Sequence, residues 1–105
     1  MSEIRIILVT CPDSPQSLEL ARELVHSKLA SCVNLIPGVT SIYHWHNELH
    51  EDKEQLMVIK TSSERIAQLE SKVLELHPYD TPEFVVIEPD RVNEKYLKWI
   101  IASID

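Results

Sequence analysis

The chain has 105 residues, of which 44% are hydrophobic, and its formal net charge is −7. This length and composition predict one folded domain over residues 1–105 and exclude a disordered chain. The chain has a single glycine, which excludes a glycine-rich phosphate loop. It has ten basic and seventeen acidic residues, which predicts no nucleic-acid partner, because an acidic surface repels phosphate. The same acidity favours cationic ligands, divalent metals among them.

The N-terminal residues and the two cysteines indicate the compartment in which the protein works. Met1–Glu3 leads straight into an apolar segment with no basic region before it, which predicts no secretory signal, and no apolar stretch reaches the ~18 residues of a membrane span. Cys11 and Cys32 are separated by a predicted helix of roughly 20 Å, too far for a disulfide. We therefore expect reduced thiols in a cytoplasmic protein with no membrane partner.

The first half of the chain predicts a strand and a helix. Residues 4–10 are a β-branched apolar run that is typical of a central strand. Ser14 is placed to be the N-cap of the helix, and Pro15 occupies its first position, where a missing N–H costs nothing. Helical spacing of apolar residues continues to Leu29.

A long β-hairpin is predicted next. Residues 32–46 form an extended segment, with a bulge or bend at Pro37–Gly38. The polar residues 47–52 indicate a turn, and residues 56–59 are the centre of a third strand. The hairpin is long enough to project beyond the body of the domain.

The remaining segments are a helix, a strand and a final helix. Residues 61–64 have the spacing of a capping box, and the helix that follows ends near His77, before Pro78. Residues 84–87 are the fourth strand. The last helix carries an apolar stripe of Val92, Tyr96, Trp99, Ile100 and Ile104.

This order of elements predicts an α+β, ferredoxin-like βαββαβ sandwich with an added C-terminal helix. Two short helices cannot cover Val9, Leu35 and Val58 together with their apolar neighbours. Either the final helix covers the remainder or other subunits do, and we expect a homo-oligomer.

Histidines are concentrated in the predicted hairpin. If His44 and His46 alternate along one strand, both point to the same face, and with His50 and Asp52 they form a set of metal-competent groups. The alternative is a solvent-exposed strand that happens to carry histidine. Tyr43 and Trp45 then lie on the opposite face, where packing explains them.

The segment His77–Glu83 holds two prolines four residues apart, which predicts a rigid connection. His77, Tyr79 and Glu83 on that frame would be preorganised to bind a metal or a polar ligand. The alternative is that the segment only sets the angle between helix and strand. No serine, cysteine or lysine nucleophile has a base and an orienting partner at a specific spacing, so the sequence does not predict an enzyme.

Four stretches together resemble the CutA family of divalent-cation tolerance proteins, and the likeness covers nearly the whole chain. They are Ala30–Tyr43, Ile59–Thr61, His77–Tyr79 with Pro82 and Glu83, and Asn93–Ile100. The resemblance implies a ferredoxin-like subunit in a tightly packed homotrimer, similar in architecture to PII signalling proteins. It also implies a link to copper and other divalent metals.

The resemblance suggests site residues as well. His77 matches a proposed metal ligand of the family, while a second histidine and a cysteine of some members are Leu76 and Val9 here. Residues that match the lining of the family's intersubunit cleft are Trp45, Lys60, Tyr79 and Glu83. A site formed by His44 and His46 would be peculiar to this protein.

Two functions follow from these patterns. The first is a non-enzymatic homotrimer that binds Cu(II) or a similar divalent ion at His77, His44 and His46, with no organic cofactor. The second is a PII-like signalling or adaptor trimer that binds a small metabolite in the cleft, with Lys60 as the charge partner. Hydrolytic or other catalysis is a third possibility.

Overall fold

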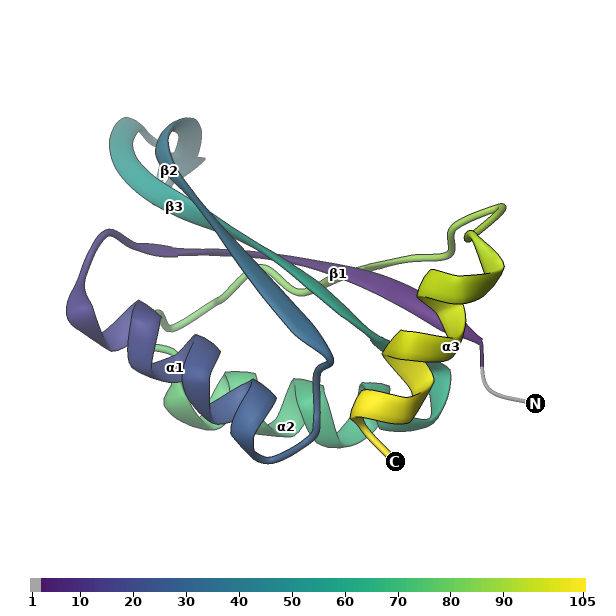
Figure 1. The fold of residues 1–105 in the computed structure, drawn as a ribbon. Coiled ribbons are helices and arrows are strands. Elements are labelled where there is room, and N and C mark those ends of the chain that lie inside the picture. Colours follow the sequence, from purple (N-terminus) through teal and green to yellow (C-terminus); the bar gives the residue numbers. More distant parts are fainter. Residues whose placement is uncertain (1–2) are drawn as a thin grey trace.

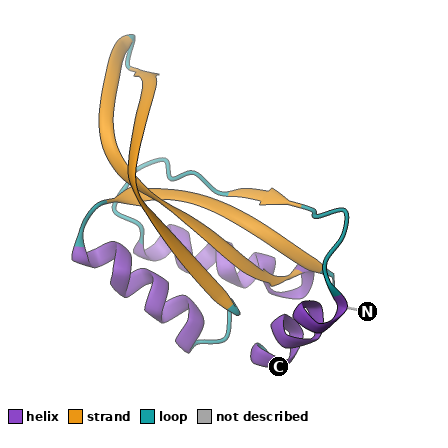
Figure 2. Ribbon diagram, turned by 45° about the horizontal axis from the view of Figure 1, so that its top comes forward, coloured by secondary structure: helices purple, strands orange, loops and turns teal. Residues whose placement is uncertain are grey.

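The computed structural model describes residues 3–105, so the predictions that involve Met1 and Ser2 lie outside the described residues. The elements follow the predicted order (Figures 1 and 2). They are β1 (Ile4–Pro12), α1 (Pro15–His26), β2 (Cys32–Trp45), β3 (Glu48–Ser62), a 3₁₀ turn (Ser63–Arg65), α2 (Ile66–Leu76), β4 (Val85–Ile87) and α3 (Glu94–Ser103).

The four strands form one antiparallel sheet in the order β2-β3-β1-β4. Helices α1 and α2 pack side by side under one face of it (Figure 1), which confirms the ferredoxin-like prediction. Alternation along the strands sends every second residue into this interface. The buried core there consists of Ile7, Val9, Cys11, Leu20, Ala21, Leu24, Leu29, Ala30, Met57, Ile59, Leu69 and Val73.

The other face of the sheet is apolar and open. Residues directly opposite each other in the register share a face, and the pairs Ile6–Ile87, Leu8–Val85 and Leu8–Val58 alternate with the core positions. The open sheet face, as we call it, comprises Ile6, Leu8, Ile36, Leu56, Val58, Val85 and Ile87. Val85 is 46% exposed and Ile36 45% exposed.

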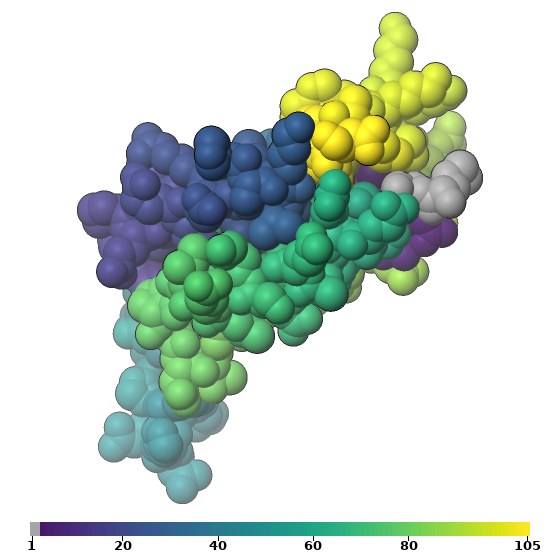
Figure 3. Space-filling view, turned by 90° about the horizontal axis from the view of Figure 1, so that it is seen from below, coloured from purple at the N-terminus to yellow at the C-terminus, as the bar shows by residue number. Residues whose placement is uncertain are grey.

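Helix α3 does not cover this face. Seen from below, it lies on the same side of the molecule as α1 and α2 (Figure 3). The Ile100 carbonyl of α3 accepts a hydrogen bond from the Ser31 hydroxyl (2.6 Å), and the carbonyl of Ile104, just after the helix, accepts one from the Arg65 side chain (2.6 Å). The final helix was one of two elements predicted to cover the remaining apolar face of the sheet, the other being neighbouring subunits. The position of α3 excludes the helix. Val9 and Leu35, which were expected there, lie on the helix-covered side.

The hairpin of β2 and β3 projects from the body (Figure 2), and its turn is shorter than predicted. Residues 47–52 are not a turn, because β3 begins at Glu48 and only His46 and Asn47 connect the strands. Both have positive φ, 52° and 64°, as a two-residue hairpin turn of the primed type requires. The bulge at Pro37–Gly38 is confirmed by the register shift between Ile36 and Val39.

Two helix ends also differ from prediction. Helix α1 ends at His26, and Lys28 takes a left-handed φ of 62° where glycine is usual. The capping box of residues 61–64 is absent, because Thr61 is the penultimate residue of β3 and its hydroxyl donates to the Leu29 carbonyl at 2.7 Å. The end of α2 before His77 is confirmed.

Two further expectations can be compared with the structure. Cys11 and Cys32 are both free thiols. Among the described residues, no helix is long and apolar enough to cross a membrane.

Candidate functional site

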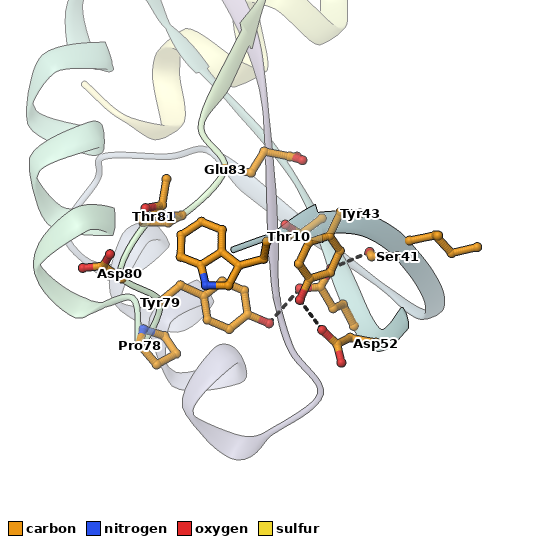
Figure 4. Close-up of a pocket in the computed structure, with 13 residues that line it drawn as sticks. Thr10, Ser41, Tyr43, Asp52, Pro78, Tyr79, Asp80, Thr81 and Glu83 are labelled. Carbon is orange, nitrogen blue, oxygen red and sulfur yellow. Dashed lines mark hydrogen bonds between the residues drawn. The ribbon is translucent and has the colours of Figure 1, made fainter. Parts of the chain in front are cut away.

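A cleft of about 840 Å³ lies between the projecting hairpin and the loop that joins α2 to β4. The loop contributes Tyr79 and Glu83, β2 contributes Tyr43, and β3 contributes Asp52 (Figure 4). The full lining is Thr10, Ser41, Ile42, Tyr43, Trp45, Asp52, Glu54, Pro78, Tyr79, Asp80, Thr81, Pro82 and Glu83. The predicted rigid segment therefore forms one wall of the cleft.

Glu54 of β3 is the buried carboxylate of the cleft, only 7% exposed. One carboxylate oxygen accepts a hydrogen bond from the Tyr79 hydroxyl at 2.7 Å, and the other accepts from the Ser41 hydroxyl at 2.5 Å. A buried charge needs such partners to offset the loss of water. Glu54 thereby links the two walls of the cleft, the hairpin and the α2–β4 loop.

The cleft carries strong negative charge. Four of its lining residues are carboxylates, Asp52, Glu54, Asp80 and Glu83, and none of the described lining residues is Lys, Arg or His. Tyr43 donates a hydrogen bond from its hydroxyl to Asp52. An unneutralised group of acids with low-polarity walls concentrates cations from solution.

The titrating groups of the cleft reflect this charge. Burial, and then the charge of Glu54, raises the pKa of Glu83 above the ordinary value. Burial and then the hydrogen bond to Glu54 raise the pKa of Tyr79 far above its usual range. Tyr79 is therefore a hydrogen-bond donor at any physiological pH, and Glu83 is a carboxylate that would be stabilised by a nearby cation.

His77 lies behind the cleft and is buried, with both ring nitrogens in use. Nε2 lies 2.8 Å from the Thr10 carbonyl oxygen of β1, and Nδ1 accepts a hydrogen bond from the Tyr79 N–H at 3.1 Å. This pairing assigns the proton to Nε2. His77 thus ties the α2–β4 loop to β1, and a metal ion could bind its ring only if one of these contacts were lost.

The hairpin histidines are not gathered on one face. Strand β2 ends at Trp45, so His46 lies in the turn and does not alternate with His44 as predicted. His44 is opposite Leu49, whereas His50 stacks on Tyr43 of the other face with ring centroids 5.5 Å apart. Within residues 3–105, no three His, Cys, Asp or Glu side chains are arranged to hold a metal ion. The metal role of His44, His46 and His77 stays a prediction.

Comparison with known proteins identifies the family. The family model described as CutA1 divalent ion tolerance protein matches residues 5–103. The chain belongs to the CutA family. The divalent-cation tolerance protein CutA of Thermus thermophilus is 40% identical over 90% of this chain and 92% of its own length.

Other CutA proteins agree. The CutA homolog of Xenopus laevis is 45% identical over 88% of this chain, which spans 61% of that longer protein. The crystal structure of CutA from Xylella fastidiosa is 34% identical and matches this fold with a TM-score of 0.95, over 99% of this chain and 100% of that one.

The CutA resemblance assigned four residues to an intersubunit cleft, which stays a prediction for a single chain, and the residue patterns missed several residues that line the present cleft. Trp45, Tyr79 and Glu83 line the cleft, whereas Lys60 lies on the sheet and donates to the Asn34 side chain. Glu54 and Ser41 were missed, and Asp52 was predicted only as a metal-competent group beside the hairpin histidines. Glu54 lies in the polar run of residues 50–55, where no pattern distinguishes a buried acid from exposed ones.

Proposed function

We propose that this CutA protein binds divalent cations in its acidic cleft, without catalysing a reaction, and that it works as a homotrimer. The observation that carries the proposal is the lining of the cleft, with four carboxylates and no basic side chain among the described residues. Carboxylate oxygens are common ligands of divalent ions. Divalent ion tolerance is also the property that the family's name records.

We expect the affinity of one chain for metal to be modest. The described residues hold no group of three metal-competent side chains, so water or a second subunit has to complete the coordination of any ion. Glu83 has no hydrogen-bond or ion-pair partner among residues 3–105, and it is the carboxylate that is most available to an ion.

The trimer is proposed from the open sheet face. Its apolar side chains, such as Val85 and Ile36, are nearly half exposed in the single chain, and large contiguous apolar patches mark interfaces. A chain of 105 residues buries a limited share of its own surface. Association through this face would add the missing burial and join three copies around one apolar centre.

Copper(II) is the ion that we propose first, because imidazole is one of its preferred ligands. His77 does not fit a metal in the described conformation, since both of its ring nitrogens contact backbone groups. His44 and His46 are exposed at the end of the hairpin and lie outside the cleft lining, and the His46 ring packs edge-on against Trp45 with ring centroids 5.0 Å apart. If these imidazoles bind copper, they would make the binding of Cu(II) stronger than the binding of other divalent ions.

Calorimetric titration of chelator-treated protein with CuCl₂ and ZnCl₂ tests this proposal. We expect Glu83→Gln to weaken binding of both ions and the double variant His44→Ala, His46→Ala to weaken copper alone. Glu70→Gln, which removes the same charge from the exposed surface of α2, is the matched control and should change neither. Absence of saturable binding by either ion would overturn the proposal.

A second candidate is a PII-like signalling or adaptor trimer with a small metabolite in the cleft. The volume of about 840 Å³ favours it, because small-molecule sites have this size and a bare ion needs far less. Lys60, the expected partner of an anionic metabolite, lies outside the lining. Binding that survives chelation and is lost in Lys60→Ala would support the anionic version.

A further inference from the structure

The walls of the cleft combine aromatic rings with carboxylates. Tyr43, Trp45 and Tyr79 supply three rings, and Pro78 and Pro82 add apolar surface. Tyr43 and Tyr79 come from opposite walls and approach the same space (Figure 4). Aromatic faces attract cations through their electron-rich surfaces and also pack against methylene groups.

The carboxylates are distributed over both walls. Asp52 and Glu54 belong to β3 of the hairpin, and Asp80 and Glu83 belong to the α2–β4 loop. Glu54 is fixed by Tyr79 and Ser41, but each of its oxygens accepts only one of these hydrogen bonds and keeps further acceptor capacity. Glu83 has no hydrogen-bond or ion-pair partner within residues 3–105. Negative charge is thus offered at two sides of an aromatic-lined space.

A small metal ion uses little of this arrangement. It would leave most of the 840 Å³ empty, and the faces of the three aromatic rings would give it no ligand atoms. An anionic ligand would meet four carboxylates with no basic residue of the described lining to offset them. A neutral ligand would leave the negative charge of the four carboxylates without a counter-charge.

We infer that the cleft binds an aliphatic polyamine, an organic cation with two or more ammonium groups joined by methylene chains. The ammonium groups pair with carboxylates of the two walls, and the methylenes pack on Trp45, Tyr43 and Tyr79. The inference concerns the cleft of the proposed function but does not depend on metal binding. It gives the metabolite of the second candidate a chemical class.

The test is calorimetric titration of metal-free, full-length protein with spermidine and putrescine at low salt. We expect saturable binding, at least tenfold weaker in Trp45→Ala and at least fivefold weaker in Glu83→Gln. Glu70→Gln, with the same loss of charge far from the cleft, should change the affinity less than twofold. Circular dichroism of each variant verifies that the fold is retained.

Two control ligands similar in length to putrescine complete the test, one uncharged and one negatively charged. We expect 1,4-butanediol and succinate not to bind. Spermidine binding that is unchanged in both Trp45→Ala and Glu83→Gln would overturn the inference, because it would show attraction to the general negative surface only. No spermidine binding would also overturn it. Separate titration with CuCl₂ and ZnCl₂ distinguishes its failure from failure of the metal proposal.

Discussion

The hydroxyl of Tyr79 donates a 2.7 Å hydrogen bond to the carboxylate of Glu54, although the two residues are 25 positions apart in the chain. This contact joins the α2–β4 loop to the base of the projecting hairpin. Glu54 is 7% exposed, so its charge depends on Tyr79 and Ser41 in place of water. This pair links the two walls of the cleft and holds one of its four carboxylates in place.

Tyr79→Phe should therefore destabilise the fold. It leaves a buried carboxylate with one partner in place of two, which costs about 1–3 kcal/mol. Chemical denaturation monitored by circular dichroism measures the loss. Tyr43→Phe is the matched control, because Tyr43 is 39% exposed and its partner Asp52 is also exposed, and it should cost less than about 0.5 kcal/mol. Equal losses in the two variants would contradict the role given to Glu54.

His77 should be a structural residue first. Replacement by alanine removes the partner of the Thr10 carbonyl and that of the Tyr79 N–H, and we expect a loss of about 2–4 kcal/mol. His77→Asn places an acceptor near the position of Nδ1 and should recover part of the loss. Urea denaturation of both variants in the presence of a chelator measures this, and unchanged stability of His77→Ala would show that the two contacts are unimportant.

The order of the elements could be predicted because their signals are local. Apolar β-branched runs and Pro15 indicated β1 and the start of α1, and Pro78 indicated the end of α2. The end of α1 could not be predicted, because Lys28 and not glycine takes the left-handed position. The two-residue turn at His46–Asn47 could not be predicted either, because the polar residues that suggested a longer turn belong to β3.

The candidate site was harder to predict than the fold. Tyr79 and Glu83 were found because prolines mark their loop, and Trp45 through its likeness to the family. The role of Glu54 could not be predicted, because its hydrogen-bond partners Ser41 and Tyr79 lie 13 and 25 residues away in the sequence and meet it only in the folded protein. Burial of a single acid within a polar strand leaves no periodic signal in the sequence.

Glu83 should make stability depend on pH in a predictable direction. Its pKa in the folded protein is raised above the ordinary 4.5 by burial and by Glu54, so the protonated form is the one that folding favours. Its favourable contribution is complete below about pH 4.5 and is lost as the pH rises through the raised value. Glu83→Gln should accordingly stabilise the metal-free protein at pH 7, with a gain that shrinks in acid.

Thermal denaturation at pH 7 and pH 4 measures this difference. Glu70→Gln on the exposed surface of α2 is the control and should change the melting temperature little at either pH. If Glu83→Gln lowered the melting temperature at pH 7, the unfavourable burial of this carboxylate would be refuted.

Val58 should be essential for association. It lies on the open sheet face opposite Leu8 and Asn34, and a carboxylate there would be buried without a partner if three copies met through this face. We expect Val58→Asp to sediment as a folded monomer. Leu74→Asp, on α2 and 50% exposed, should keep the mass of the wild type. A trimer in both variants would exclude this face as the interface.

Native mass spectrometry of chelator-treated protein, titrated with Cu(II) and Zn(II), tests the proposed metal-binding homotrimer most directly. We expect three times the 12.1 kDa chain mass and uptake of ions that saturates in multiples of three. A monomer, or a trimer that takes up ions only in scattered numbers without saturation, would contradict it.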